Sequence, residues 1–375
     1  MPEARAGVCI GLMSGTSLDA VDAAACRFDA EGRFTALLAS TTLSYPDDLR
    51  AALLRVQRAP DAAITPRAWA ALDEAVADRF AAAVEQLLAS SGLRSDEVLA
   101  IGSHGQTVFH DPSTLHTSLQ LGNPSLIAAR SRIATVGDFR RADLALGGHG
   151  APLVPAFHHA LFAGPQTRVI ANIGGIANIT VLPGDDAAQV FGFDTGPGNA
   201  LLDEWTQRHL NQAFDRDGLW AASGTADAAL LQNCLRDPYF GAAPPKSTGR
   251  DRFNLDWLAQ QGVIQQLAPA DVQATLLELT AGSLSTAITQ STAVPATVYV
   301  CGGGARNLYL MQRLQSLLAP LHTVTTTREL GLDPSWVEAG AFAWLAWRRL
   351  FDLPGSLPAV TGARRAAVLG GVYAP

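Results

Sequence analysis

Hydrophobic and polar positions alternate along the first part of the chain. Apolar runs at 8–10, 20–28 and 34–43 are separated by glycine and polar residues, and this pattern predicts an antiparallel β-meander. From 66 to 90 the apolar residues recur every four positions and Gly92 follows, which predicts a helix that ends in a left-handed glycine cap. Short strands are expected at 98–101, running into Ser103-His104-Gly105-Gln106, and at 132–136.

The pattern of the first part begins again after residue 168. Apolar runs at 169–170, 179–182 and 191–193 predict a second meander, and each meander opens with a strand that runs into a glycine-containing turn. A strand at 298–301 and helices at 307–318 and 334–350 complete this half. The aperiodic stretch 140–155 is expected to hold the domain crossover. The predicted domains are 1–138 with 360–375, and 139–359.

The composition describes a globular chain of two domains, with 375 residues, 48% hydrophobic and 16% charged. The net charge of −7 and the absence of Lys or Arg runs give a nucleic-acid role no electrostatic support, whereas small anions can still bind to backbone N–H groups. No window approaches the roughly 20 apolar residues that span a bilayer. The cysteines are scattered without a C-x-x-C pair, which favours reduced thiols and a cytoplasmic protein; they are Cys9, Cys26, Cys234 and Cys301.

Three glycine-rich turns could carry chemistry. The first, at 11–19, has two glycines and three hydroxyl residues after an apolar strand, and successive N–H groups in such a turn form an anion-binding nest. It is not a P-loop, because no Gly-Lys-Ser/Thr ends it. Taken alone, it is equally consistent with an ordinary hairpin turn.

The second turn, at 193–199, places a carboxylate at the end of a short strand, before a glycine-containing turn and a helix that opens near residue 201. Asp194 there could act as a general base, or it could cap the turn or the helix. Asp-Thr-Gly occurs once, so an aspartic protease, which needs a second copy, is excluded. The third turn, Gly302-Gly303-Gly304, lets a flat group such as adenine or ribose lie on the backbone, and it lacks the G-x-G-x-x-G spacing of a dinucleotide fold. Together the three turns indicate a two-lobed ATPase.

Seven segments in family order make the chain similar to the anhydro-N-acetylmuramic acid kinases, within the actin/hexokinase/heat-shock-chaperone ATPase superfamily. The segments are 11–22, 103–107, 137–155, 172–178, 193–199, 245–254 and 301–307. The resemblance implies an α/β protein with a two-lobed actin-like/hexokinase-like ATPase fold, ribonuclease H-like duplicated domains and an interdomain cleft. It also implies a kinase of peptidoglycan recycling that uses ATP and Mg²⁺. Such enzymes open 1,6-anhydro-N-acetylmuramic acid with water and phosphorylate O6; a homodimer is implied by the family alone.

The resemblance assigns roles by position in the motifs. Asp194 is the catalytic base that deprotonates the attacking water. The implied sugar-binding residues are His104, Gln106, Asp138, Arg140 and Glu338. The implied nucleotide-binding residues are Gly11, Leu12, Met13, Ser14, Gly15, Thr16, Ser17, Leu18, Gly174, Gly175, Gly196, Gly198, Asn199, Gly302, Gly303 and Gly304.

Several of these roles have alternatives. Glu338 could be a solvated helix residue, and Arg140 could pair with Asp138 or Asp143 instead of a substrate carboxylate. The cluster 246–250 could be ordered by a ligand or be structural. Two other functions stay open, a conventional amino-sugar kinase and an actin-like nucleotide switch.

The chain departs from related patterns at two places. Leu12 and Met13 stand where many kinases of the superfamily have a magnesium-ordering aspartate, so the metal ligands are unknown from sequence. His149 stands where the family usually has Gln, and we assign it no role.

Overall fold

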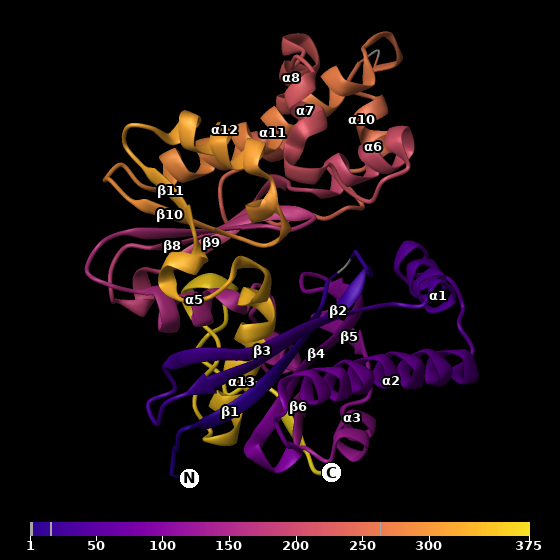
Figure 1. The fold of residues 1–375 in the computed structure, drawn as a ribbon, viewed down its shortest axis with the longest axis vertical. Helices are drawn as coiled ribbons and strands as arrows, with labels where there is room; N and C mark the ends of the chain where they lie inside the picture. Colours follow the sequence, from indigo (N-terminus) through magenta and orange to yellow (C-terminus); the bar gives the residue numbers. More distant parts are fainter. Residues whose placement is uncertain (1–2, 16, 263) are drawn as a thin grey trace. The chain divides into compact units, whose positions relative to one another are not determined.

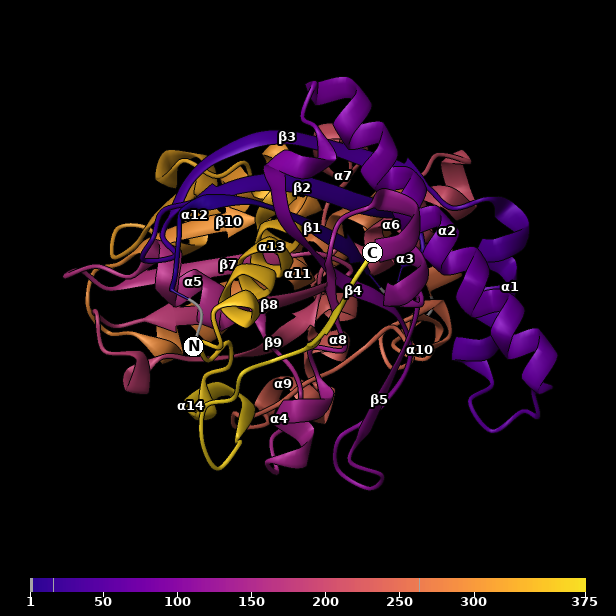
Figure 2. The ribbon, with the colours of Figure 1, turned by 90° about the horizontal axis from the view of Figure 1, so that it is seen from below.

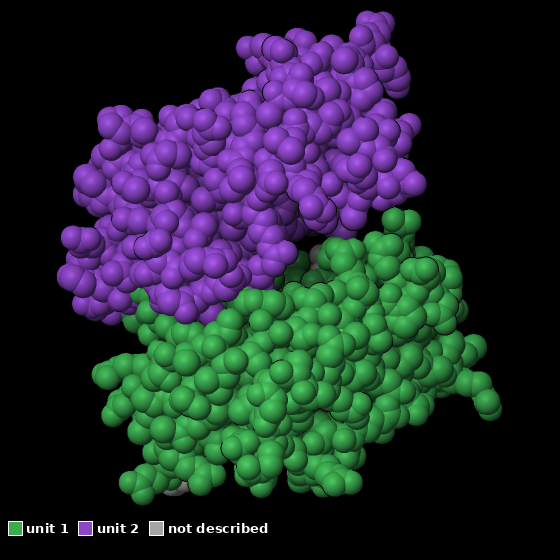
Figure 3. Space-filling model, viewed as in Figure 1, with its two compact units in different colours: residues 1–162, 336–375 green, residues 163–335 purple. Residues whose placement is uncertain are grey.

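The computed structural model describes residues 3–15, 17–262 and 264–375. The chain forms two compact units, coloured separately in Figure 3: unit 1 is residues 1–162 with 336–375, and unit 2 is residues 163–335. Unit 1 therefore contains two segments, 139–162 and 336–359, that the sequence pattern placed in the other domain. The reason is packing, because the helix at 337–350 contacts strands β1, β2 and β4 of unit 1.

Unit 1 is built on a seven-stranded sheet with the order β12-β6-β4-β1-β2-β3, and β5 pairs with β4 (Figure 1). The predicted meander is confirmed: β1 pairs antiparallel with β2, and β2 antiparallel with β3, whereas β1 and β4 are parallel. The strands are β1 (Gly7–Ser14), β2 (Ala20–Phe28), β3 (Phe34–Ser44), β4 (Val98–Asp111), β5 (Thr117–Leu121), β6 (Thr135–Gly137) and β12 (Gly371–Tyr373).

Two of the predicted strand boundaries were wrong. Strand β4 continues to Asp111, so the Ser103–Thr107 motif lies inside the strand, where Gln106 and Thr107 pair with β5. Strand β6 begins only at Thr135, because Arg132 adopts a left-handed conformation (φ 58°) and ends the preceding helix. The motif is therefore held on both sides by β-sheet hydrogen bonds rather than by a loop.

Helices cover the sheet of unit 1, as Figures 1 and 2 show. Helix α2 begins after Thr65, whose hydroxyl accepts the N–H of Ala68, and it ends at Gly92 (φ 73°), as predicted. Its residues Val76 and Phe80 belong to one hydrophobic core with Ile10 of β1. The helices are α1 (Asp47–Arg58), α2 (Pro66–Ser91), α3 (Pro124–Ser131), α4 (Arg141–Ala145), α5 (Val154–Phe162), α13 (Val337–Leu350) and α14 (Pro358–Thr361).

Helix α13 approaches the sheet closely at two paired glycines, Gly11 of β1 and Gly102 of β4. A Cβ on Gly11 would collide with the carbonyl oxygen of Ala339, and one on Gly102 with that of Phe342. The two glycines thus form a flat patch on which the helix backbone rests.

Unit 2 repeats the strand arrangement of unit 1. Its sheet has the order β11-β10-β7-β8-β9, which matches β6-β4-β1-β2-β3, with antiparallel β7–β8 and β8–β9 pairs and parallel β7–β10 and β10–β11 pairs. The predicted duplication is confirmed by this match. The strands are β7 (Arg168–Ile173), β8 (Ile176–Leu182), β9 (Phe191–Pro197), β10 (Thr297–Cys301) and β11 (Thr323–Thr326).

Helix α11 provides much of the separate hydrophobic core of unit 2, with Leu276, Leu277 and Leu284 packed against residues of β7 and β8. None of the helices in the described part of the chain is both long and apolar enough to cross a membrane. The helices are α6 (Ala200–Leu210), α7 (Leu219–Ser223), α8 (Ala228–Leu235), α9 (Pro238–Gly241), α10 (Leu255–Ala259), α11 (Pro269–Ser291) and α12 (Leu308–Leu318).

Candidate active-site residues of the two units

The first glycine turn is shorter in the structure than in the sequence prediction. Gly11, Leu12, Met13 and Ser14 lie within β1, and the turn follows at 15–18, closed by a 3.3 Å hydrogen bond from the N–H of Leu18 to the carbonyl of Gly15. Thr16 lies outside the described residues. Because helix α13 covers Gly11 and Leu12 is fully buried, these two residues act in packing.

Buried side chains anchor this turn by hydrogen bonds. Gln106 has no solvent exposure, and its Nε2 donates to the carbonyls of Gly15 and Thr107, each at 3.2 Å. Its Oε1 accepts the hydroxyl of Tyr45 at 3.1 Å. Since Gln106 is fully buried and Nε2 donates to two backbone carbonyls, the geometry favours an anchor of the turn over the predicted sugar contact. Tyr45 has no sequence signal beyond its place just after a strand.

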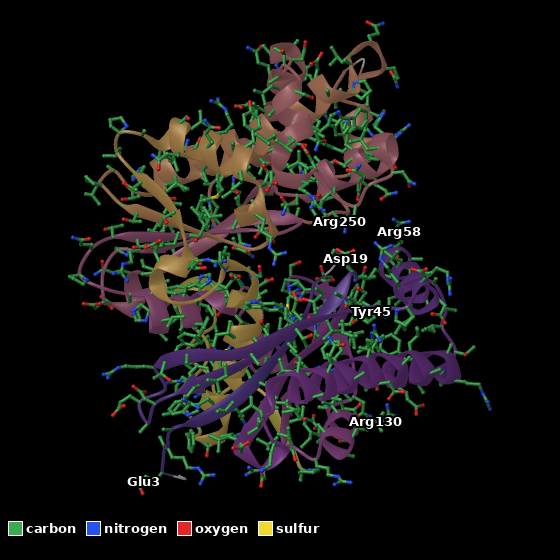
Figure 4. The ribbon with its side chains drawn as sticks, viewed as in Figure 1. Glu3, Asp19, Tyr45, Arg58, Arg130 and Arg250 are labelled. Atoms are coloured by element: carbon green, nitrogen blue, oxygen red, sulfur yellow. The ribbon has the colours of Figure 1, made fainter. Side chains whose placement is uncertain are left out.

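The end of the turn is held by two further contacts. The Nε of Arg50 donates to the carbonyl of Leu18 at 3.1 Å, and the backbone N–H of Tyr45 donates to the carbonyl of Asp19 at 3.2 Å. Figure 4 shows Asp19 and Tyr45 at the same end of the sheet of unit 1. Leu18 is in the left-handed region (φ 57°), and these two hydrogen bonds stabilise that conformation.

His104 and Arg140, both predicted as sugar ligands, lie together in unit 1. Nη2 of Arg140 is 2.7 Å from Nε2 of His104, and Nη1 donates to the carbonyl of Gly150 at 2.7 Å. Because a guanidinium only donates, Nε2 of His104 accepts and the neutral ring carries its proton on Nδ1. Burial and the charge of Arg140 hold the pKa of His104 well below its usual range. The pair therefore presents one cation and one neutral imidazole.

The alternative partners of Arg140 are not used. Asp138 pairs with Arg141 (3.7 Å). Asp143 accepts the N–H of Gly150 (2.8 Å) and the hydroxyl of Thr361 (2.8 Å), so it fixes the loop whose carbonyl holds Arg140. Burial lowers the pKa of Arg140 to about 10, which leaves it cationic at neutral pH.

Two carboxylates of unit 1 have raised pKa values. Glu338, at the start of α13, owes its raised pKa to burial and to the negative charge of Asp22, against the opposing effect of Arg140. Glu338 is thus a partly buried carboxylate that interacts with the charge of Arg140, rather than a fully solvated helix residue. Burial also raises the pKa of Asp138, which sits in the left-handed region (φ 59°) just after β6.

In unit 2 the backbone brings glycine segments from different strands together. The N–H groups of Gly198 and Asn199 donate to the carbonyls of Gly175 and Gly174, at 2.9 and 2.7 Å. The turn between β7 and β8 is therefore joined to the turn between β9 and α6. Sequence spacing alone had not linked these two turns.

The triple glycine after β10 lies next to these two turns. Gly302 adopts φ 78°, and a Cβ there would meet the carbonyl oxygen of Ile173 at 2.8 Å, while a Cβ on Gly303 would lie 3.3 Å from Nδ2 of Asn199. Gly196 differs, because it lies within β9 against the ring of Phe240 and acts in packing. Unit 2 thus offers glycine backbone without side chains at 174–175 and 302–304, which suits phosphate and ribose.

Asp194 lies in β9 of unit 2, beside these turns. Its N–H donates to the carbonyl of Lys246 (3.2 Å), its carbonyl accepts the hydroxyl of Tyr239 (2.6 Å), and its Oδ2 accepts the N–H of Thr248 (3.0 Å). Burial raises the pKa of Asp194 to about 6, and the Thr248 hydrogen bond opposes the rise. Oδ1 has no hydrogen bond to the described residues, so one oxygen of a half-buried carboxyl group with a raised pKa is left for chemistry.

The 246–250 cluster is part of the same region. Besides the Lys246 and Thr248 contacts to Asp194, Arg250 (labelled in Figure 4) pairs with Glu204 of α6 at 2.8 Å. Within the part of the chain that the structure describes, no group of three or more His, Cys, Asp or Glu side chains could hold a metal ion. Lys246 and Thr248 of the cluster thus contact the candidate base directly.

Comparison with known proteins gives a consistent result. The sequence model of a family described as anhydro-N-acetylmuramic acid kinase matches residues 7–375. The chain is 51% identical over 368 residues to the anhydro-N-acetylmuramic acid kinase of Shewanella halifaxensis, covering 97% of this chain and 98% of that relative. It is 46% identical over 375 residues to the enzyme of the same name from Coxiella burnetii, covering 100% and 98%.

Among solved structures, the chain is similar to component A of the (R)-2-hydroxyglutaryl-CoA dehydratase of Acidaminococcus fermentans. The TM-score is 0.50 at 11% identity, over 92% of this chain and 98% of that chain. At this identity the likeness shows the fold alone. With the duplicated sheets, it confirms the predicted α/β fold of two related lobes.

Proposed function

Since the chain belongs to the anhydro-N-acetylmuramic acid kinase family, we propose that it converts 1,6-anhydro-N-acetylmuramic acid and ATP into N-acetylmuramic acid 6-phosphate and ADP. In this reaction water adds to C1, the bond between C1 and O6 breaks, and O6 takes the γ-phosphoryl group. The family match over nearly the whole chain supports the proposal.

Asp194 is the general base in this proposal, and its environment is the observation that carries it. The carboxyl group has a pKa of about 6, so it is ionised at neutral pH yet basic enough to accept a proton from water. Thr248 holds Oδ2, which leaves Oδ1 to receive the proton. The proton lost by the water resides on Asp194 while O6 leaves C1 and attacks phosphorus.

Backbone amides bind the nucleotide in this proposal. The turn 15–18 of unit 1 and the glycine segments 174–175 and 303–304 of unit 2 are the segments that suit phosphate and ribose, and the N–H groups of 198–199 hold 174–175 in place. The buried Gln106 supports the first of these turns. A net charge of −7 does not oppose anion binding by such groups, because they act at short range.

The sugar contacts in this proposal come from His104, Arg140 and Glu338. Arg140 is cationic and has no carboxylate within ion-pair distance among the described residues, so it suits the lactyl carboxylate of the substrate. His104, neutral with one N–H, and Glu338 suit sugar hydroxyl groups.

Mg²⁺ fits the residues present as an ion that arrives with ATP. A magnesium ion on a nucleotide keeps several waters and takes only one or two protein carboxylates. Asp22, whose negative charge acts on Glu338, could supply one of them. When bound, the ion would neutralise phosphate charge. We further propose a cytoplasmic role in recycling cell-wall sugars, which the four free cysteines support.

The test is mass spectrometry of the products formed from the anhydro sugar, ATP and magnesium in ¹⁸O-labelled water. A phosphorylated sugar with one heavy oxygen at C1 is the expected result. Phosphorylation of an open-ring amino sugar alone would replace the proposal with a conventional sugar kinase. ATP hydrolysis without any sugar product would replace it with a nucleotide switch.

A further inference from the structure

Lys246 is the only lysine of the chain: of its 27 basic residues, the other 26 are arginine. Where a cationic side chain contacts only solvent or a carboxylate, lysine and arginine can replace one another, and at such positions this chain has arginine. The two differ where a compact ammonium with three convergent donors is needed, because a guanidinium is planar and forked. The single lysine therefore directs attention to what its ammonium contacts.

The ammonium of Lys246 holds two consecutive carbonyls of the neighbouring segment. Nζ donates to the carbonyl oxygens of Tyr239 (3.1 Å) and Phe240 (3.4 Å), and it lies 4.8 Å from the centre of the Tyr239 ring. Burial lowers the pKa of Lys246. Among the described residues it forms no ion pair; the ammonium ties 246 to 239–240 and lies 5.8 Å from the centre of the ring of Phe193, the residue before Asp194.

These contacts form a closed ring with Asp194. The N–H of Asp194 donates to the Lys246 carbonyl, Nζ of Lys246 donates to the Tyr239 carbonyl, and the Tyr239 hydroxyl donates to the Asp194 carbonyl. Two residues beyond Lys246, the N–H of Thr248 donates to Oδ2 of Asp194. The ammonium is the only side-chain cation in this ring.

We propose that Lys246 is a positioning residue for Asp194: its ammonium fixes the segment 246–248 so that the Thr248 N–H stays on Oδ2 and Oδ1 stays free for the water. This inference rests on the proposed function, in which Asp194 is the base. Without the ammonium, the 246–248 segment is released from 239–240 and the Thr248 hydrogen bond weakens. Since that bond lowers the pKa of Asp194, its loss raises it.

The first experiment compares K246M, which keeps the length of the side chain, and K246R with the wild-type enzyme. Misplacement of a reacting group by about 1 Å costs on the order of 100-fold in rate, so we expect kcat for K246M to fall by about that factor at pH 7. The KM for ATP should stay within about twofold, and the acidic limb of the pH–kcat/KM profile should move to higher pH. K246R should behave like K246M. The exposed Arg208→Lys exchange in the same unit is the matched control and should leave all three quantities unchanged.

The second experiment restores the ammonium. K246C treated with 2-bromoethylamine acquires an aminoethyl side chain of nearly lysine's length, and the four native cysteines are buried. Recovery of kcat on alkylation is expected. In the wild-type protein, labelling with ¹⁵Nζ-lysine gives a single side-chain resonance, which should shift in D194N.

The outcomes separate the two proposals. A K246M variant that loses thermal stability but keeps the wild-type pH profile, or an unmodified K246C as active as the alkylated protein, would overturn the positioning role. An active D194N would instead remove the base assignment on which that role rests. Full activity of K246R would show that any cation suffices and would also refute the inference.

Discussion

The hydroxyl of Tyr45 donates to Oε1 of Gln106 at 3.1 Å, in the interior of unit 1. The carbonyls of Gly15 and Thr107 only accept, so Nε2 of Gln106 faces them and Oε1 faces the Tyr45 hydroxyl. A tyrosine just after β3 thus satisfies the remaining polar atom of the side chain that anchors the candidate phosphate turn.

Replacing Tyr45 with Phe should loosen that turn. An unsatisfied Oε1 in the interior costs about 1–3 kcal/mol, and we expect the free energy of unfolding to fall within that range. The KM for ATP should rise more than that for the sugar. Chemical denaturation and steady-state kinetics measure the two effects, with Tyr373→Phe at the C-terminal strand as the control. An unchanged ATP KM would mean that Gln106 does not support the turn.

Asp194→Asn should abolish turnover and keep ATP binding within a few-fold of wild type. Loss of a general base costs about 10²–10⁴-fold, whereas the amides that suit phosphate lie in other segments. Calorimetry with a non-hydrolysable ATP analogue and single-turnover assays test the two parts. Near-normal turnover would show that another group takes the proton.

The pH dependence of activity should reflect Asp194. Since its pKa is about 6, kcat/KM should fall below about pH 6 as the carboxylate protonates.

The free energy of unfolding should depend on pH in the opposite direction. A carboxyl group whose pKa is raised by folding stabilises the fold at low pH, and this contribution is lost as the pH rises through about 6. Unfolding free energies of wild type and D194N between pH 4 and 8, roughly spanning that pKa, should therefore diverge in slope. Parallel curves would contradict the assigned pKa.

Gly11→Ala should destabilise unit 1, because the new methyl group meets the backbone of α13. Overpacking against backbone costs about 3 kcal/mol. Gly184→Ala, with no atom within 4 Å of the added carbon, is the matched control and should be nearly neutral. If Gly11→Ala instead kept its stability and lost ATP affinity, Gly11 would belong to the phosphate turn, as the sequence predicted.

Much of the fold could be predicted because its signals are local. The spacing of apolar residues in α2 and the glycine at 92 depend on neighbouring residues alone, and the structure confirms both. The place of α13 could not be predicted, because its contact with Gly11 and Gly102 joins segments hundreds of positions apart.

For the candidate site, motif position located Asp194, and the raised pKa supports its choice. The anchoring role of Gln106 was missed, because burial inside β4 is not visible in a five-residue motif. The contacts of Lys246 were missed for a similar reason: the carbonyls that it binds follow no pattern of side chains.

The discontinuity of unit 1 has a consequence for biosynthesis. Strands β1 and β4 leave the ribosome early, yet the helix that covers their paired glycines begins only at residue 337. All of residues 163–335, which form the compact unit 2, are translated in between. One apolar face of the first sheet therefore stays without its covering helix until translation is almost finished. A truncation before residue 337 would leave that face permanently exposed to solvent and to other chains.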